Sequence, residues 1–287
     1  MKQSVSEIKT HIGKAEKISV KKQCELLQIS RSGHYYQKVP ESDLNLKLIE
    51  MIDREFMEHP WKGVPRMVQW LNKGRGLSVN KKRVERLYRV MGISASAPGP
   101  GTIKKGIEKK EKIFPYLLKN LAVTRSNQVW AMDITFIPVK GGYLYLVAII
   151  DHYSRYVVAR NLSNTMTAEW CRDVLDEAIK TYGKPQIINT DQGSQFTSDL
   201  FTEYVKSHKN IRQSMDGKGR ALDNIFVERL WRSVKYENVY LYAYQDGKQC
   251  YIGLNKYFAY YNHSRRHQSL GYEVPAQMFN QKEKKAA

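Results

Sequence analysis

The chain has 287 residues, 42% of them apolar, and this length predicts two or three domains, since one domain usually takes roughly 100 to 200 residues. The longest apolar stretch, Tyr143 to Ile150, is much shorter than the roughly 20 residues of a membrane-spanning helix, and no apolar signal region begins the chain, so we expect neither a membrane nor a secreted protein. Cys24, Cys171 and Cys250 stand far apart without metal-binding spacing, which indicates a reducing compartment and no structural zinc.

Charge is the strongest compositional signal, because 47 Lys and Arg residues against 28 Asp and Glu residues give a net charge of +19. Such a field attracts polyanions by steering and by counterion release, so nucleic acid is the partner we expect. The excess is uneven: residues 1–124 carry 25 basic and 12 acidic side chains, and residues 125–287 carry 22 and 16. We therefore expect the N-terminal part to hold DNA, the alternative being an ordinary solvated basic surface.

The N-terminal part of the chain predicts two helical units. Residues 18–37 indicate a helix, a tight turn and a second helix, which suits a helix-turn-helix within a segment 1–40. A plain helical hairpin is the alternative there, because the turn lacks its usual glycine. Residues 41–97 predict a second unit, with a helical stripe over 46–56, a short helix over 67–72 and a helix that Asn80 caps and Gly92 ends.

The last of these helices has a strongly basic face. Its apolar face is predicted as Val84, Leu87, Val90 and Met91, and its other face holds Lys81, Lys82, Arg83, Arg86 and Arg89. A basic helix face is usually only solvated, but beside a candidate helix-turn-helix we expect DNA contact from Lys81, Lys82, Arg83 and Arg86. Residues 98–122 then combine Pro and Gly with a run of lysines and predict a linker.

Beyond the linker the pattern changes from helix to strand. We expect strands over 129–139, 143–150 and 155–161 in an antiparallel meander, then helices over 168–181 and 200–207 that alternate with strands over 186–190 and 211–215. The strand–helix–strand succession implies a parallel crossover that places the fourth strand beside the first. A helix over 224–236 completes the order βββαβαβα of an α/β, ribonuclease-H-like fold, in a core over 123–240 followed by a helical extension over 241–287.

Three carboxylates occupy positions that suit phosphodiester chemistry on divalent metal ions. Asp133 lies in an apolar strand, where an unpaired charge is costly to bury, Asp191 ends the fourth strand, and Glu228 lies on the last helix. Two divalent ions about 3.5 to 4 Å apart stabilise the attacking and leaving oxygens, and they need oxygen ligands that converge from separate elements. Each residue alone has an ordinary structural explanation, but together they favour a catalytic site. The other acidic residues of the core that we considered predict caps, turns or surface charges: Asp151, Asp199, Asp223 and Glu237.

The motifs around these carboxylates resemble those of the second-reading-frame (OrfB) transposase protein of bacterial IS3-family insertion sequences and, more distantly, those of retroviral integrases. The matching catalytic segments are Trp130 to Thr135, Thr190 to Phe196, and Asp223-Asn224 followed by Glu228-Arg229. Further segments resemble the family's N-terminal helical module and its C-terminal signature: His59-Pro60-Trp61, Val79 to Val84, Tyr261 to His267, Leu270-Gly271-Tyr272 and Pro275. The resemblance covers nearly the whole chain.

The resemblance implies a DNA transposase with a DDE integrase catalytic core. Asp133, Asp191 and Glu228 would be its metal-binding catalytic triad, with two Mg²⁺ or Mn²⁺ ions, for 3′-end nicking and strand transfer. Lys235 matches a basic family position expected to touch the DNA ends, and two helical turns place it on nearly the same face as Glu228. Arg265 and His267 of the C-terminal signature are also expected to contact DNA, a structural role being the alternative for His267.

Partners and a location follow from the same resemblance. They are the insertion-sequence ends and target DNA, further copies of the chain on DNA, and an upstream-frame (OrfA) protein, separate or fused by frameshifting, in the bacterial cytoplasm at the nucleoid. Two features depart from the family. Asp191 and Glu228 are separated by one residue more than usual, and Lys62 to Arg66 replaces the usual run after His-Pro-Trp, which weakens transfer of a DNA-contact role to that segment.

Two other functions are consistent with parts of the sequence. A non-catalytic DNA-binding descendant of such an element would keep the fold, but the intact triad argues against it. A ribonuclease-H-like nuclease acting on RNA–DNA hybrids or junctions would leave the N-terminal helical units and the C-terminal signature without a role.

Overall fold

A computed structural model describes residues 12–13, 18–36, 40–96, 114–217 and 224–281 of the chain. The chain forms two compact units, Met1–Met51 and Ile52–Ala287. Most of the predicted linker and Asp223 lie outside the described residues, and the five-part division into domains stays a prediction. Among the described residues, no helix combines the length and the apolar character needed to cross a membrane.

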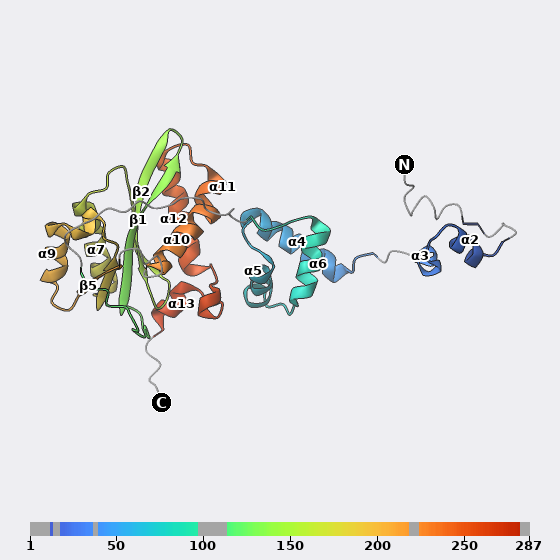
Figure 1. The fold of residues 1–287 in the computed structure, drawn as a ribbon, viewed down its shortest axis with the longest axis horizontal. Coiled ribbons are helices and arrows are strands. Elements are labelled where there is room, and N and C mark those ends of the chain that lie inside the picture. The colour runs from blue at the N-terminus through green and yellow to red at the C-terminus, as the bar shows by residue number, and fades with distance from the viewer. Residues whose placement is uncertain (1–11, 14–17, 37–39, 97–113, 218–223, 282–287) are drawn as a thin grey trace, which may run out of the picture. The chain divides into compact units, whose positions relative to one another are not determined.

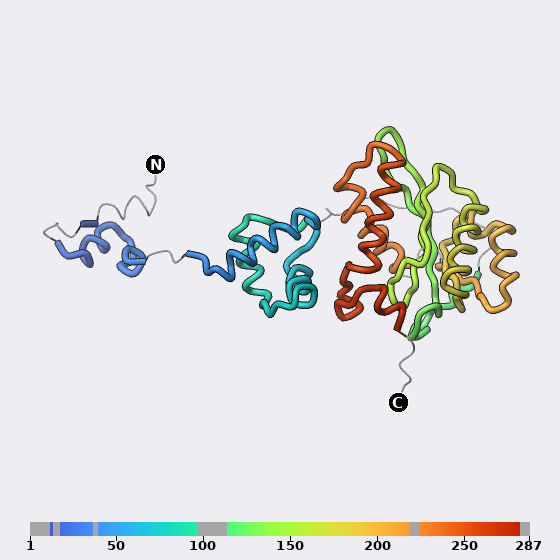
Figure 2. Tube along the Cα trace, turned by 180° about the vertical axis from the view of Figure 1, so that it is seen from behind, coloured from blue at the N-terminus to red at the C-terminus, as the bar shows by residue number. Residues whose placement is uncertain are grey.

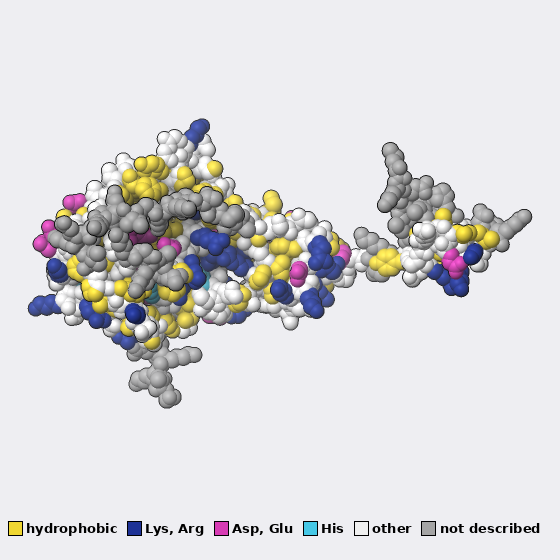
Figure 3. Space-filling view, in the orientation of Figure 1, with side chains coloured by type: hydrophobic (Ala, Val, Ile, Leu, Met, Phe, Trp, Pro, Cys, Tyr) yellow, Lys and Arg dark blue, Asp and Glu magenta, His cyan; other side chains and the backbone are white. Residues whose placement is uncertain are grey.

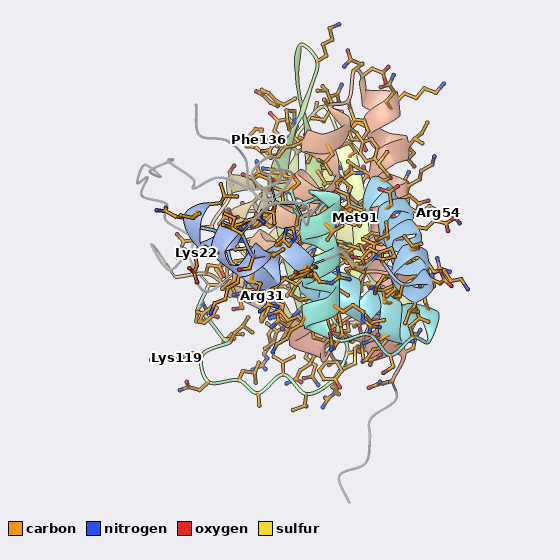
Figure 4. All side chains as sticks on the ribbon, turned by 90° about the vertical axis from the view of Figure 1, so that its right-hand side faces the viewer. Lys22, Arg31, Arg54, Met91, Lys119 and Phe136 are labelled. Carbon is orange, nitrogen blue, oxygen red and sulfur yellow. The ribbon has the colours of Figure 1, made fainter. Side chains whose placement is uncertain are left out.

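The first unit contains the two short helices that the sequence predicted. They are α2 (Val20–Leu26) and α3 (Arg31–Tyr35), on which Figure 4 labels Lys22 and Arg31. Each begins at a serine whose hydroxyl accepts a hydrogen bond from a backbone N–H of the first turn. The turn between them needs a left-handed residue, and Gln28, at φ 54°, takes the place of the glycine that is usual there.

Helix α4 (Asp43–Glu58) is followed by α5 (Val64–Gln69), the π-helix η1 (Trp70–Gly74) and α6 (Lys81–Met91). The predicted ends of α6 are confirmed, because the Asn80 side chain accepts a hydrogen bond from the Arg83 N–H at 2.8 Å and Gly92 is left-handed. The predicted apolar face was wrong at Val90, which is 56% exposed. The stripe runs instead through Val84, Leu87 and Tyr88, because these follow the helical period and the Tyr88 hydroxyl donates to a buried carbonyl.

A five-stranded mixed sheet forms the centre of the second unit (Figure 1). Strands β1 (Val129–Val139), β2 (Gly142–Asp151) and β3 (Val157–Ser163) form the predicted meander. Strands β4 (Ile187–Thr190) and β5 (Arg212–Met215) follow helix α7 (Ala168–Tyr182) and helices α8 (Ser194–Thr197) and α9 (Asp199–Ser207), respectively. The order is β3-β2-β1-β4-β5, with β4 parallel to β1 as predicted.

Helices cover both faces of this sheet. One apolar core joins Trp130, Met132 and Ile188 of the strands to residues of α7 and α9. The other joins Ala131 and Ile150 to α10 (Ile225–Val234), the π-helix η2 (Lys235–Val239) and α12 (Gly247–His263), with the short α11 (Tyr240–Tyr242) between the last two. The turn η3 (Gln268–Leu270) and α13 (Pro275–Asn280) follow. Figure 2 shows the red C-terminal helices and the olive-to-amber α7–α9 on opposite sides of the sheet.

The three cysteines are buried and form no disulfide, at 2% exposure for Cys24 and 0% for Cys171 and Cys250. Burial raises the pKa of the Cys171 thiol to about 12 and that of Cys250 to about 11.

Large side chains are exposed elsewhere: Phe136, labelled in Figure 4, and Tyr143 are 51% and 57% exposed on β1 and β2.

Candidate active site

The register between β1 and β4 brings Asp133 and Asp191 to one edge of the sheet. The two strands are parallel and their last paired residues are Met132 and Thr190, so Asp133 is the next residue of β1 and Asp191 directly follows β4. Asp133 is half-buried and Asp191 is exposed. Burial, and next the negative charge of Asp191, raise the pKa of Asp133 to about 7. The two carboxylates therefore form one electrostatically coupled site.

Helix α10 contributes to this site through Trp231, for which we found no functional signal in the sequence. Its indole N–H donates to Asp133 Oδ2 at 2.8 Å and so orients the carboxylate. Glu228 precedes Trp231 by three residues, a spacing that places side chains about 5–6 Å apart on one helix face. The predicted third carboxylate is thus on the element that contacts Asp133, with its own side chain exposed to solvent.

The carboxylate oxygens of Asp133, Asp191 and Glu228 do not all lie within 4.8 Å of one another in the structure. Among the described residues, the three acidic or histidine side chains whose ligand atoms lie within 4.8 Å of one another are Glu55, Glu58 and His59. Glu55 is already paired with the Lys62 ammonium and lies 3.0 Å from the His59 ring nitrogen. That cluster is an internal ion pair of the helical region, and it lies outside the predicted triad.

Gly193 explains how Asp191 is oriented. The Gly193 N–H donates to Asp191 Oδ1 at 2.8 Å, which closes a tight turn directly after β4. A Cβ at position 193 would lie 2.8 Å from the same oxygen, too close for any other residue without displacing the carboxylate. The glycine of the Asp-Gln-Gly motif therefore serves the geometry of Asp191.

A further carboxylate, Asp216, lies at the same edge and was missed from the sequence. It follows β5, which is parallel to β4 and pairs Met215 with Thr190. The Asn189 amide donates to Asp216 Oδ1 at 2.8 Å, and the charge of Asp216 adds to the raised pKa of Asp133. The argument that found Asp191, a carboxylate directly after a parallel strand, applies equally to Asp216.

Lys235 lies within electrostatic range of Asp133, as its place two turns after Glu228 suggested. It is the first residue of η2, where α10 continues into a π-helix. Burial lowers the pKa of Lys235, and the negative charge of Asp133 acts in the opposite direction. The charges of Lys235 and Asp133 thus interact, and contact of Lys235 with DNA stays a prediction.

Arg265 and His267 of the C-terminal signature are not the exposed cationic side chains that we expected to contact DNA. Arg265 is 6% exposed, and its guanidinium donates to Glu237 Oε2 at 2.7 Å and to Glu237 Oε1 at 2.6 Å. His267 stacks edge-on against Tyr261, and burial and the charge of Arg265 lower its pKa to about 2. The Arg265 guanidinium is already paired with a carboxylate, and the His267 imidazole is neutral. Both groups are therefore poor phosphate ligands, and the predicted DNA contacts of Arg265 and His267 are corrected. Glu237 is likewise buried, at 5% exposure, and is not the surface charge that we expected.

The basic residues of α6 remain candidates for DNA contact. Lys81, Lys82 and Arg83 are exposed and Arg86 is half-buried. Figure 3 shows Lys and Arg side chains at the surface of the helices that precede residue 97. Their DNA contact stays a prediction.

Comparisons with known proteins agree with this arrangement. Two models of an integrase core domain match residues 123–221 and 209–275, and a model of an HTH-like domain matches residues 43–100. The chain is 32% identical over 242 residues to the transposase for insertion sequence element IS904 of Lactococcus lactis, a match that covers 79% of this chain and 91% of that one. The chain belongs to the IS3 family of insertion-sequence transposases.

A second relative and a solved structure extend the comparison. The transposase InsF for insertion sequence IS3A of Escherichia coli is 29% identical over 282 residues, covering 91% of this chain and 94% of that one. A chain of the simian T-cell lymphotropic virus intasome in complex with a PP2A regulatory subunit aligns with a TM-score of 0.51 at 16% identity, over 83% of this chain and 76% of that one. The transposase therefore has the predicted ribonuclease-H-like integrase fold and is an enzyme of the transposase/integrase type that acts on DNA.

Proposed function

We propose that the transposase nicks DNA at the 3′ ends of its insertion sequence and joins those ends to target DNA, with Asp133, Asp191 and Glu228 as the catalytic carboxylates. The observation that carries this proposal is the β1–β4 register, which places two aspartates side by side at a strand edge. Helix α10 adds Trp231 on Asp133 and Glu228 one turn away. In-line displacement at phosphorus needs carboxylates that can be gathered around metal ions and needs no side-chain nucleophile.

The residues of this edge suit hard divalent cations. All three proposed ligands are carboxylates, and the pKa of Asp133 is raised first by burial and next by the negative charge of Asp191, which a cation would counter. Asp133, Asp191 and Glu228 would hold two Mg²⁺ or Mn²⁺ ions. When bound, such ions neutralise charge on the phosphate and promote ionisation of the attacking hydroxyl.

The chain itself supplies orientation and charge. Trp231 and Gly193 hold the two aspartates in fixed orientations through their N–H groups. Lys235 provides a positive charge beside Asp133 that would contact a phosphate of the DNA end. Lys81, Lys82, Arg83 and Arg86 would bind the phosphate backbone, because an exposed basic helix face in an HTH-like domain suits that role.

We also propose that this chain works together with other subunits in the bacterial cytoplasm. Two element ends must be processed together, so copies of the transposase would assemble on DNA. An upstream-frame (OrfA) protein, separate or fused by frameshifting, would supply end recognition. The matches to transposases named for insertion elements support a role of the chain at the ends of such an element.

Substitution of Glu228 tests the proposed chemistry. The Glu228→Gln variant keeps the size and helix propensity of the side chain but removes a ligand charge, so nicking and strand transfer should both fall by at least about 100-fold while DNA binding is retained. Glu203→Gln, which changes another exposed helical glutamate, is the matched control and should behave as wild type. Near-normal activity of Glu228→Gln would exclude Glu228 from the triad.

The same assay separates the proposal from its rivals. A non-catalytic DNA-binding protein would bind DNA in Mn²⁺ without nicking it. A nuclease for RNA–DNA hybrids would cleave a hybrid and give no strand-transfer product from element ends.

A further inference from the structure

The helix that carries Glu228 changes its hydrogen-bonding pattern where it passes the active site. Helix α10 ends at Val234 and continues as the π-helix η2 (Lys235–Val239). A π-helix inserts one residue into a turn and so rotates the side chains that follow, and such turns are frequent at functional sites. Lys235, whose charge interacts with that of Asp133, is the first residue of this turn. Whatever fixes η2 therefore fixes Lys235.

Glu237, in the middle of η2, is the anchor of the turn. Its carboxylate accepts two hydrogen bonds from Arg265, at 2.7 and 2.6 Å, and one from the Tyr257 hydroxyl at 2.8 Å. It also accepts one from Arg66 Nη1 at 2.9 Å. Tyr257 lies on α12, Arg265 in the C-terminal signature and Arg66 on α5 of the HTH-like domain. Three segments distant in sequence thus converge on one carboxylate.

Burial makes these contacts strong. A carboxylate at 5% exposure must be paired, because an unpaired buried charge is far costlier than an exposed one. The positive charges of Arg265 and Arg66 accordingly lower the pKa of Glu237 to about 2. By contrast, the ion pair of Lys73 with Glu273, at 2.7 Å, has both side chains about 40% exposed. An exposed pair of that kind contributes little.

We infer that Glu237 is a positioning residue, and that the Arg66–Glu237 ion pair makes the placement of Lys235 beside the catalytic carboxylates depend on helix α5 of the HTH-like domain. The inference rests on the proposed function, in which Lys235 contacts the DNA end. It gives Arg265 of the C-terminal signature a role without DNA contact, as the fixed partner of Glu237. It also gives the transposase a direct link from its helical region to its active site.

Arg66→Gln tests the link without exposing the whole buried cluster, since the Arg66 side chain is 38% exposed and Arg265 still neutralises Glu237. In the full chain, we expect the single-turnover strand-transfer rate at saturating DNA to fall about tenfold or more, with DNA affinity changed less than about twofold. Lys73→Gln is the matched control, because it removes a basic side chain that also pairs with a distant glutamate but not with Glu237. It should leave the rate unchanged.

Conservative substitutions distinguish positioning from simple stabilisation. Arg66 uses one nitrogen on Glu237, so Arg66→Lys should recover most of the rate. Arg265 uses two nitrogens as a fork, which lysine cannot reproduce, so Arg265→Lys should not. Melting temperatures of all variants show whether a lost rate merely follows lost stability; an Arg66→Gln rate loss that tracks only a lower melting temperature would overturn the inference.

A double-mutant cycle with Lys235→Met identifies the route. If Arg66 acts through Lys235, the double variant should be no slower than Lys235→Met alone, since one effect contains the other. Additive losses would overturn the inference while leaving the triad proposal intact. If Lys235→Met itself has no effect on the rate, the role of Lys235 in the proposed function fails together with the inference. A loss of activity in Glu228→Gln would still support the carboxylate chemistry independently.

Discussion

At Asp133, burial and two neighbouring carboxylates act in the same direction. Burial, Asp191 and Asp216 all favour the protonated acid, whereas hydrogen bonds from the Trp231 indole and a backbone N–H favour the ionised form. A side chain in this position costs the fold stability when it is charged. A divalent cation would counter the repulsion between these carboxylates, so their negative charges suit a site for metal.

Metal binding should therefore appear as thermal stabilisation. We expect millimolar Mg²⁺ or Mn²⁺ to raise the melting temperature of the wild type, because the ion binds the folded site only. The double variant Asp133→Asn with Asp191→Asn should lose this response. Asp53→Asn with Asp173→Asn removes the same charge from exposed positions and should keep it. An equal response of the wild type and the Asp133/Asp191 variant would show that the ions bind elsewhere.

The pKa of Glu237 is lowered, whereas that of Asp133 is raised, so ionised Glu237 stabilises the fold and this stabilisation depends on pH. Its pKa falls from 4.5 to about 2 in the folded chain, so its contribution is fully present above about pH 4.5 and is lost as the pH falls towards about 2. That shift corresponds to roughly 3 kcal/mol. Denaturant unfolding should show Glu237→Gln less stable than wild type by about this amount at pH 6, with the difference shrinking by pH 3. A difference independent of pH would mean that Glu237 acts through packing alone.

Single residues also mark the limit of sequence reasoning. Asp133 and Asp191 could be selected because strand ends and crossover handedness bring them together by local rules. The environment of Glu237 could not be predicted, because Arg66 and Arg265 reach it from positions 171 residues before and 28 residues after it. Charge is visible in a sequence, but whether a charged side chain is buried depends on such distant contacts. Because that burial could not be seen, Arg265 and His267 were expected to contact DNA.

At the scale of elements, periodic segments were predictable and irregular turns were not. The strands and α7 follow from hydrophobic patterns and from stop signals such as Gly183. The π-helix η2 has no comparable signal, since Lys-Tyr-Glu-Asn-Val contains neither glycine nor proline and fits an ordinary helix. Contacts of Glu237 with three other segments accompany that π-helical conformation, and a window of local sequence contains none of them.

Helix α6 carries the prediction that belongs to this scale. Each lysine or arginine on a DNA phosphate contributes about 0.9 to the slope of log affinity against log salt. Replacing Lys81, Lys82 and Arg83 by glutamine should therefore reduce that slope by about 2 to 3 and weaken binding on all sequences. The control for net charge replaces three exposed lysines of the integrase core domain by glutamine: Lys184, Lys206 and Lys209. Equal slopes for the two triple variants would remove α6 from the DNA interface.

For the whole molecule, the uneven charge indicates that the N-terminal part of the chain binds DNA non-specifically and that the C-terminal part carries the chemistry. Residues 1–124 carry 25 of the 47 basic residues but only 12 of the 28 acidic ones. Phosphate contacts of this kind position a protein on DNA without reading its sequence. We therefore expect the transposase chain to hold DNA without regard to its sequence, and we expect recognition of the element ends to come from the proposed upstream-frame product.

The full chain alone should accordingly bind end-containing and scrambled duplexes with similar affinity at matched salt, whereas the fusion with the upstream-frame product should prefer the ends. Competition binding and end-cleavage assays on both proteins measure this difference. Strong end selectivity by the isolated chain would place end recognition within its own helices before residue 97.

The buried thiols give the transposase an unreactive background for chemical labelling. Maleimides and similar reagents attack exposed thiolates, and Cys24, Cys171 and Cys250 are all shielded from solvent. A single cysteine introduced at an exposed site, such as Lys248→Cys on α12, would then carry a fluorophore at one known position. The natural sequence thereby allows its motions on DNA to be followed by fluorescence without first removing any native cysteine.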